Sequence, residues 1–92
     1  SDETVTGFGR LGHWFSSKEV FGIQPDIITC AKGLTSGYLP MGAAIISERL
    51  IDNIKNKDGS QPFTNGYTYS CHPVAAKAAL TNIDIMSRDG IL

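Results

Sequence analysis

Residues 25–47, with the sequence PDIITCAKGLTSGYLPMGAAIIS, decide the fold. Two short runs within them, residues 26–30 and 42–47, are dominated by adjacent apolar side chains, a pattern typical of strands that are buried on both faces. The loop between the two runs is rich in glycine and serine and has Pro40 near its end. The stretch therefore predicts two strands separated by a loop of small residues, and we expect residues 1–5 to be the end of a third strand.

Helices are expected in three further segments. Residues 16–22 offer Ser16 or Ser17 as the N-cap and Gly22 as a stop signal, which predicts a short helix. Residues 47–57 place apolar side chains on one side and end in lysines, which suit the C-terminus of a helix.

The longest expected helix is residues 72–90. Pro73 fits its first helical position and Gly90 fits its C-terminal cap. Apolar side chains recur at i, i+3, i+4, i+7 and i+10 and predict one buried stripe, formed by Ala76, Ala79, Leu80, Ile83 and Met86. Strands and helices therefore alternate along the chain, which predicts an α/β fold whose ligands gather at the carboxyl ends of the strands.

The composition limits the class of protein. The chain has 92 residues, 41% of them hydrophobic and 18% charged, which is typical of a globular domain. A net charge of -1 argues against a nucleic-acid partner. The lack of a long apolar run argues against a membrane partner. Two cysteines far apart in the sequence favour free thiols and a cytoplasmic location over a disulfide framework. The chain starts without Met and stops where a helix finishes, so we expect it to be part of something longer.

Gly7, Gly9 and Gly12 have the spacing G-x-G-x-x-G of a dinucleotide-binding turn. That spacing has mechanical meaning only between a strand and a helix, with an acidic residue about 20 residues further on. The residues after Gly12 do not open a helix, and Asp26 precedes its strand rather than ending it. The motif therefore predicts a tightly turning loop, not an NAD or FAD site.

Three segments together resemble the class III aminotransferases: DETVTGFGRLGHWF at residues 2–15, the stretch at residues 25–47, and NGYTYSCHPVAAKAAL at residues 65–80. The similarity is greatest to the ω-amino-acid:pyruvate branch and covers nearly the whole chain. It implies the aspartate aminotransferase fold (fold type I), with a mainly parallel sheet and flanking helices. By this resemblance residues 1–92 are part of the large domain that binds pyridoxal 5'-phosphate, in a family whose members are several times longer.

The resemblance assigns roles to individual residues. Lys32 matches the lysine that forms the Schiff base with the cofactor, and it follows directly on an expected strand. Asp2 matches the aspartate that pairs with the pyridine nitrogen, and Glu3 accompanies it without a defined role. Thr4 stands where the family usually has a valine on the ring face. Val5 falls where the members acting on GABA or ornithine carry glutamine, which favours the pyruvate-using branch.

The third segment is expected to hold the cofactor phosphate. Thr68, helped by the backbone at Tyr67, matches the threonine that binds the phosphate of the neighbouring subunit, which implies a homodimer or a larger assembly. Asn65 replaces a usual histidine and Cys71 a usual glycine, so a positive φ at Cys71 would strain the turn. Cys71 and His72 are adjacent, but nothing else completes a metal site, so no metal is expected.

The function implied by the resemblance is the transfer of an amino group from an ω-amino acid or amine to pyruvate or a similar keto acid. Two alternatives stay open: an aminomutase of the same fold, which moves an amino group within one molecule, and an inactive folding or interaction unit. The 92-residue chain by itself is predicted to be inactive, because the rest of the sheet and of the phosphate site would be missing. The identity of the amino donor does not follow from these residues.

Overall fold

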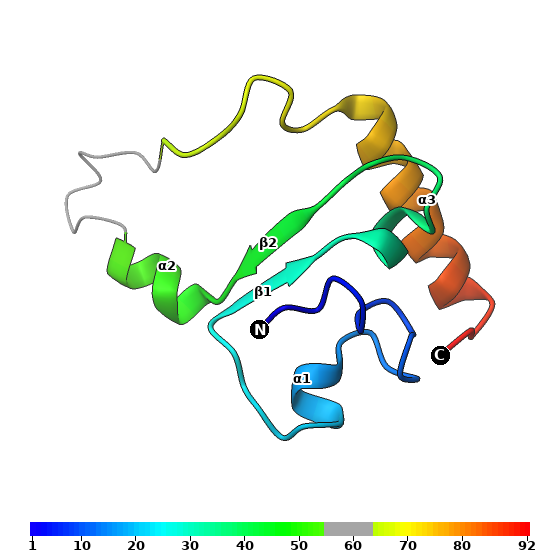
Figure 1. The fold of residues 1–92 in the computed structure, drawn as a ribbon, viewed down its shortest axis with the longest axis horizontal. Coiled ribbons are helices and arrows are strands. Elements are labelled where there is room, and N and C mark those ends of the chain that lie inside the picture. Colours follow the sequence, from blue (N-terminus) through cyan, green and yellow to red (C-terminus); the bar gives the residue numbers. More distant parts are fainter. Residues whose placement is uncertain (55–63) are drawn as a thin grey trace.

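The computed structural model describes residues 1–54 and 64–92 (Figure 1). Along the chain lie α1 (Ser16–Glu19), β1 (Ile27–Cys30), the short 3-10 helix η1 (Lys32–Thr35), β2 (Ala43–Ile46), α2 (Glu48–Ile54) and α3 (Pro73–Arg88). The two strands lie side by side in the middle of the molecule, with the N-terminal segment and α1 near β1 and with α3 beside η1. Both expected strands and all three expected helices are therefore present within the described residues.

The pairing of β1 with β2 adds an antiparallel pair to the mainly parallel sheet that was expected. Ile27 lies opposite Ile46 and Cys30 opposite Ala43. The physical reason is that the connection from β1 to β2 reverses the chain with only η1 and a loop, while a parallel neighbour requires a longer crossover. Ile27 and Ile45 are also 41% and 45% exposed, so the described residues do not bury both faces of the strands.

The expected third strand is represented by residues at the N-terminus. Asp2 forms a parallel β-bridge with Thr29. The Glu3 amide donates to the Thr29 carbonyl at 2.8 Å, and the Thr29 amide donates to the Ser1 carbonyl at 2.9 Å. This pairing brings residues 1–3 alongside β1, in the direction expected for neighbouring strands of a parallel sheet.

Helix α1 begins in a different way from the prediction. Its N-cap residue is Phe15, and both Ser16 and Ser17 are buried inside the first turn. The prediction of a serine N-cap was wrong because the Ser17 hydroxyl donates to the Glu3 carboxylate, a partner distant in sequence, instead of accepting from its own helix. Gly22 follows the helix with a φ of +65° and turns the chain toward β1.

Helix α3 begins with Pro73 in its first turn, as predicted. Gly90 follows the last turn with a φ of +58°, and the Ile91 amide donates to the Met86 carbonyl, which is the Schellman ending that glycine favours. The predicted buried stripe was correct at Ala79 and Met86, which are buried, and wrong at Leu80, which is 63% exposed. The buried residues of α3 are Ala75, Ala79 and Met86, because the helix turns this side toward η1. They pack into one apolar core with Cys30 and Leu34.

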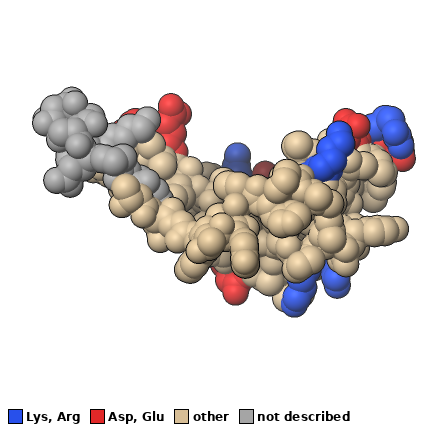
Figure 2. Space-filling view, turned by 90° about the horizontal axis from the view of Figure 1, so that it is seen from above, with Lys and Arg blue, Asp and Glu red and all other residues tan. Residues whose placement is uncertain are grey.

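The charged side chains do not form one continuous surface in the view of Figure 2. Lys and Arg side chains appear in separate places, some of them next to acidic ones. Two ion pairs contribute to this mixing, Arg49 with Asp26 and Arg88 with Asp89. No helix within residues 1–54 or 64–92 has the length and apolar character needed to span a bilayer. The lysines expected to end α2, Lys55 and Lys57, lie outside the described residues.

Candidate active site

Asp2 lies at the edge of the molecule where the N-terminal segment meets β1. Its Oδ1 accepts a hydrogen bond from the Thr4 amide at 2.9 Å and a longer one from the Thr29 hydroxyl at 3.4 Å. Hydrogen bonds from Thr4, assisted by Thr29, lower the pKa of Asp2 below its ordinary value. The side chain is exposed, so an ionised and oriented carboxylate is available to a ligand at this edge. Thr4 is half-buried beside it.

Glu3 points the other way and is one of the most deeply buried side chains, with 2% of its surface exposed. Its Oε1 accepts from the Ser17 amide at 2.6 Å and from the Ser17 hydroxyl, and its Oε2 accepts from the Thr6 hydroxyl at 2.6 Å. Burial by itself would raise the pKa of Glu3, but these hydrogen bonds and the Ser16 amide outweigh it and lower the pKa to about 2. The residue for which the sequence defined no role is therefore the anchor between the N-terminal segment and α1.

Lys32 is the first residue of η1 and comes two residues after the end of β1. Its backbone is in the left-handed region with a φ of +36°, as is that of Ser36 at the end of the same turn, with a φ of +52°. Its side chain is exposed. Asp2 is bridged to Thr29 within β1, three residues before Lys32, so β1 connects the two residues that the sequence assigned to the cofactor ring.

The turn after Lys32 lies directly against the loop that contains Gly7, Gly9 and Gly12, called the glycine loop from here on. A Cβ at Gly33 would lie 2.8 Å from the Cβ of Phe8, so this position requires glycine. A cavity of about 620 Å³ opens beside Lys32 and is also lined by Phe8, Arg10 and Asn82. Asp2 and Thr4 do not line this cavity. The space next to Lys32 therefore has α3 and the glycine loop as its walls.

The glycine loop makes the tight turns that were predicted for it. Gly9 and Gly12 have φ values of +89° and +81°, and the Gly9 amide donates to the His13 carbonyl at 3.0 Å. Phe8 packs edge-on against Trp14 and Phe15, with ring centroids 6.3 and 5.4 Å apart. The loop leads into the four-residue α1, which is much shorter than the helix that a dinucleotide-binding turn opens.

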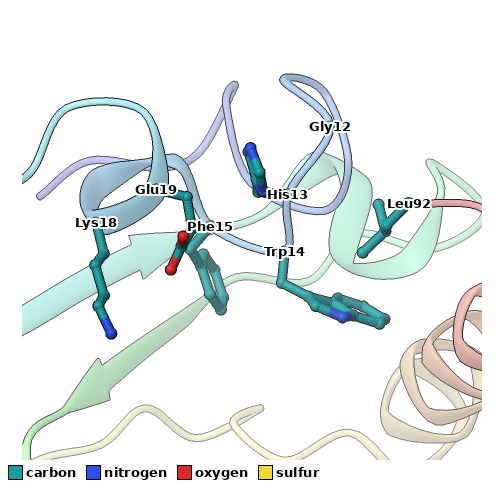
Figure 3. A pocket seen from close by; sticks show the side chains of 7 residues that line it. All are labelled: Gly12, His13, Trp14, Phe15, Lys18, Glu19 and Leu92. Atoms are coloured by element: carbon teal, nitrogen blue, oxygen red, sulfur yellow. The ribbon is translucent and has the colours of Figure 1, made fainter.

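A second cavity, of about 540 Å³, lies on the outer side of this loop. Figure 3 shows Trp14 and Leu92 on one side of it and Lys18 and Glu19 of α1 on the other. It contains none of the residues that the sequence assigned to a cofactor. In the described parts of the chain no three His, Cys, Asp or Glu side chains come together in a way that could hold a metal ion.

Tyr67 and Thr68 lie in a separate loop that leads into α3. Both residues are exposed, and the Tyr67 side chain is 85% exposed. The loop is held by local contacts, with the Tyr67 amide donating to the Ser70 hydroxyl and the Ser70 amide donating to the Tyr67 carbonyl. Cys71 closes the turn with a φ of +60°, the conformation for which glycine is suited. The structure thus joins Asp2 to Thr29 of β1, three residues before Lys32, and leaves Thr68 in a loop of its own.

Asn82 is the polar residue of this region that the sequence interpretation missed. Its Nδ2 donates to the Gly33 carbonyl at 2.8 Å and to the Leu34 carbonyl at 3.2 Å, across 49 and 48 residues of sequence. The signal that could have found it is its spacing of 7 and 3 residues after Ala75 and Ala79, which places an amide in the buried stripe. Because Leu80 was wrongly assigned to the buried side of α3, Asn82 was not expected there.

The fold is that of solved transaminases. An (S)-enantioselective ω-transaminase from Thermomicrobium roseum matches 96% of this chain and 19% of its own, with a TM-score of 0.82 and 44% sequence identity. A transaminase from the marine bacterium Virgibacillus matches with a TM-score of 0.83 and 43% identity, over 96% of this chain and 19% of its own. This confirms the predicted fold class, the α/β fold of the fold type I transaminases.

The family follows from the sequence comparison. The model of the family "Aminotransferase class-III" matches residues 1–92, and the chain belongs to this family. The putrescine–pyruvate aminotransferase of Pseudomonas aeruginosa is 46% identical over 92 residues, which are all of this chain and 19% of that protein. The β-alanine–pyruvate aminotransferase of the same organism is 45% identical over 94 residues, 99% of this chain and 21% of that protein. The chain thus spans about a fifth of the length of these curated relatives.

Proposed function

We propose that this chain is part of the large cofactor domain of an aminotransferase that transfers an amino group from an ω-amino acid or amine to pyruvate or a similar keto acid. The observation that carries the proposal is the bridge from Asp2 to Thr29 in β1, the strand that leads into Lys32. The names of the putrescine–pyruvate and β-alanine–pyruvate relatives support the choice of amino acceptor. These names also favour amino transfer over the aminomutase alternative.

The residues present fit pyridoxal phosphate. Asp2 offers an exposed carboxylate whose pKa is lowered, and this negative charge suits a protonated ring nitrogen. Lys32 offers an amine directly after β1, in a turn of small residues beside an open cavity. The hydroxyl of Thr68 and the backbone amides of its turn are donors of the kind that bind phosphate. A ring, an aldehyde and a phosphate would each find a chemically matched group among these residues.

Each of these residues would have one task. When bound, pyridoxal phosphate supplies a sink for the electrons released as the Cα–H bond of the amino substrate breaks. Asp2 would keep the proton on the ring nitrogen, and Thr4, half-buried beside it, would lie against the ring face. Lys32 would hold the cofactor through Nζ and, once exchanged for the substrate amine, would carry the proton between Cα and C4′.

Three further features belong to this proposal. Thr68 would bind the phosphate of the cofactor in a neighbouring subunit, so the active enzyme would be a homodimer or a larger assembly. Cys30 is buried and Cys71 exposed, and neither is in a disulfide. Free thiols are normal in a reducing compartment, which supports a cytoplasmic location.

The test is to identify the lysine that carries the cofactor in the whole protein. The protein is loaded with pyridoxal phosphate, reduced with borohydride and digested, and the modified peptide is mapped. We expect the label in the peptide that contains CAKGL, and we expect amino transfer to yield alanine from pyruvate. Lys18 and Lys77 are exposed and serve as internal controls for non-specific labelling. A label found chiefly at Lys18, Lys55 or Lys77 would contradict the proposal.

A further inference from the structure

Asn82 interrupts an otherwise apolar side of α3. Ala75, Ala79 and Met86 are buried on this side, and Asn82 shares their stripe at helical spacing. The amide is half-buried rather than solvent-exposed. A residue that only filled this space would be apolar, because a buried amide destabilises the fold unless its donors are satisfied. The amide at this position therefore has a role other than filling space.

The side-chain amide of Asn82 donates hydrogen bonds to the turn that carries Lys32. Its Nδ2 donates to the carbonyls of Gly33 and Leu34, the two residues directly after the lysine, at 2.8 and 3.2 Å. The Gly33 carbonyl also accepts from the Ser36 amide at 3.2 Å, so Asn82 completes a network inside η1. Figure 1 shows α3 running alongside η1, which allows one side chain of the helix to reach both carbonyls.

The turn needs such support because its backbone is strained. Lys32 and Ser36 have positive φ values, a backbone region that is unfavourable for L-residues. Strained conformations of this kind persist only where the surrounding structure over-determines them. Two contacts from distant segments reach this turn, the close approach of Phe8 to Gly33 on one side and the Asn82 amide on the other. Asn82 also lines the cavity into which Lys32 opens.

We propose that Asn82 is a positioning residue for Lys32: through the carbonyls of Gly33 and Leu34 it holds the turn that sets where the lysine amine stands. This inference rests on the proposed role of Lys32. Asn82 itself does not take part in the proton transfer. Its loss is expected to leave the fold intact and to make the lysine less well placed for its cofactor.

The experiment compares two substitutions in the whole enzyme. Asn82→Leu has a similar volume and no donor, and Asn82→Asp keeps the shape but directs an acceptor at two carbonyls. The matched control is Asn53→Leu, because the Asn53 amide also donates to a backbone carbonyl, that of Arg49 at 3.0 Å, on the distant helix α2. The cofactor is removed, pyridoxal phosphate is added back, and the rate of borohydride-trapped labelling is measured at Lys32 by peptide mapping. The pH midpoint of the cofactor absorbance is recorded as well.

We expect labelling at Lys32 to slow about ten- to a hundredfold in both Asn82 variants, as for a group misplaced by an ångström or less. The absorbance midpoint should move, while Asn53→Leu should behave as wild type and labelling at Lys18 and Lys77 should stay unchanged. Asn82→Gln keeps the donor and should restore part of the rate.

Folded Asn82 variants whose Lys32 rate and absorbance midpoint match wild type would overturn the inference. Should Asn82→Leu not fold, Asn82→Ala removes the same donor with the residue best suited to a helix, and the same comparison decides. A wild-type enzyme that takes no label at Lys32 would instead overturn the proposed function. The two failures are therefore distinguishable.

Discussion

The N-terminal half of the chain and the loop before α3 hold their candidate residues in opposite ways. Around Asp2 and Lys32, segments distant in sequence are tied together, by the bridge to Thr29 and by the Asn82 amide. Around Thr68, the hydrogen bonds among the described residues run between near neighbours, and the side chains are exposed. One region is organised from within the chain, and the other presents its groups outward.

The difference indicates where each half of a cofactor site would find its partner. A carboxylate and an amine that must act on the same ring need fixed relative positions, and the bonds through β1 supply them within one chain. A phosphate-binding loop with outward-facing donors is suited to a ligand held by something other than its own chain. The following predictions apply to the whole protein that carries this sequence and test this contrast.

The largest effect is expected from Asp2→Asn. The amide is nearly isosteric but carries no charge, so it cannot hold the proton on the ring nitrogen, and kcat should fall by about 10²-fold or more, the range for a lost acid–base contribution. Steady-state kinetics measure the loss. Asp84→Asn, which removes an exposed charge from α3, is the matched control and should be silent. An Asp2→Asn enzyme with wild-type kcat would remove Asp2 from the site.

The second prediction concerns which subunit Thr68 serves. Lys32→Ala and Thr68→Ala subunits are each expected to be poorly active, yet subunit exchange between them should create one intact site in every heterodimer. At equal mixing the activity should approach about a quarter of the wild-type value, since half of the dimers are mixed and each has one working site. Activity is measured at limiting pyridoxal phosphate before and after exchange. If no activity is recovered after verified exchange, Lys32 and Thr68 belong to the same subunit's site. Thr68 would then not serve the neighbouring subunit.

The third prediction tests the internal tie of the N-terminal half. Glu3→Gln should lower the free energy of unfolding by about 1–3 kcal/mol at neutral pH, because the buried charge accepts hydrogen bonds from Ser17 and Thr6. The pKa of Glu3 is lowered in the folded state to about 2, so its contribution is present above the ordinary value of 4.5 and is lost as the pH falls toward 2.

Thermal unfolding of wild type and Glu3→Gln between pH 7 and the lowest pH at which both stay folded measures this prediction. The difference in melting temperature should narrow as the pH drops below 4.5. Glu19→Gln, an exposed glutamate on the neighbouring α1, is the control and should show no such narrowing. A constant difference across this range would mean that Glu3 acts through its shape and not through its charge.

The smallest effect is expected at the outward-facing loop. Cys71 has a φ of +60°, and Cys71→Gly relieves a strain of about 1 kcal/mol, partly offset by the greater freedom of glycine in the unfolded chain. A small rise in melting temperature should result. Cys71→Ala keeps the Cβ and should give no rise. Equal behaviour of the two variants would show that the turn bears no strain at this residue.

Individual residues show how far prediction from the sequence reached. The strand positions, the glycine turns, Pro73 at the start of α3 and Gly90 at its end were predicted correctly, because each depends on a local backbone preference. The Ser16 or Ser17 cap was wrong because Glu3, more than a dozen residues away, takes the Ser17 hydroxyl. Leu80 was wrongly placed in the core, since which side of a helix is buried depends on what lies against it. The roles of Asp2, Lys32, Tyr67 and Thr68 stay predictions.

The sequence by itself determined the family, the order of the elements and the identity of the candidate residues, because motifs and turn preferences are written in residues close together along the chain. Only the tertiary structure decided the antiparallel pairing of β1 with β2, the bridge between Asp2 and Thr29, and the placement of Glu3 and Asn82. The physical reason is that a hydrogen bond between residues 48 or 49 positions apart has no local signature. Such a bond forms only when folding brings the donor and the acceptor together and removes the water that was bound to the donor.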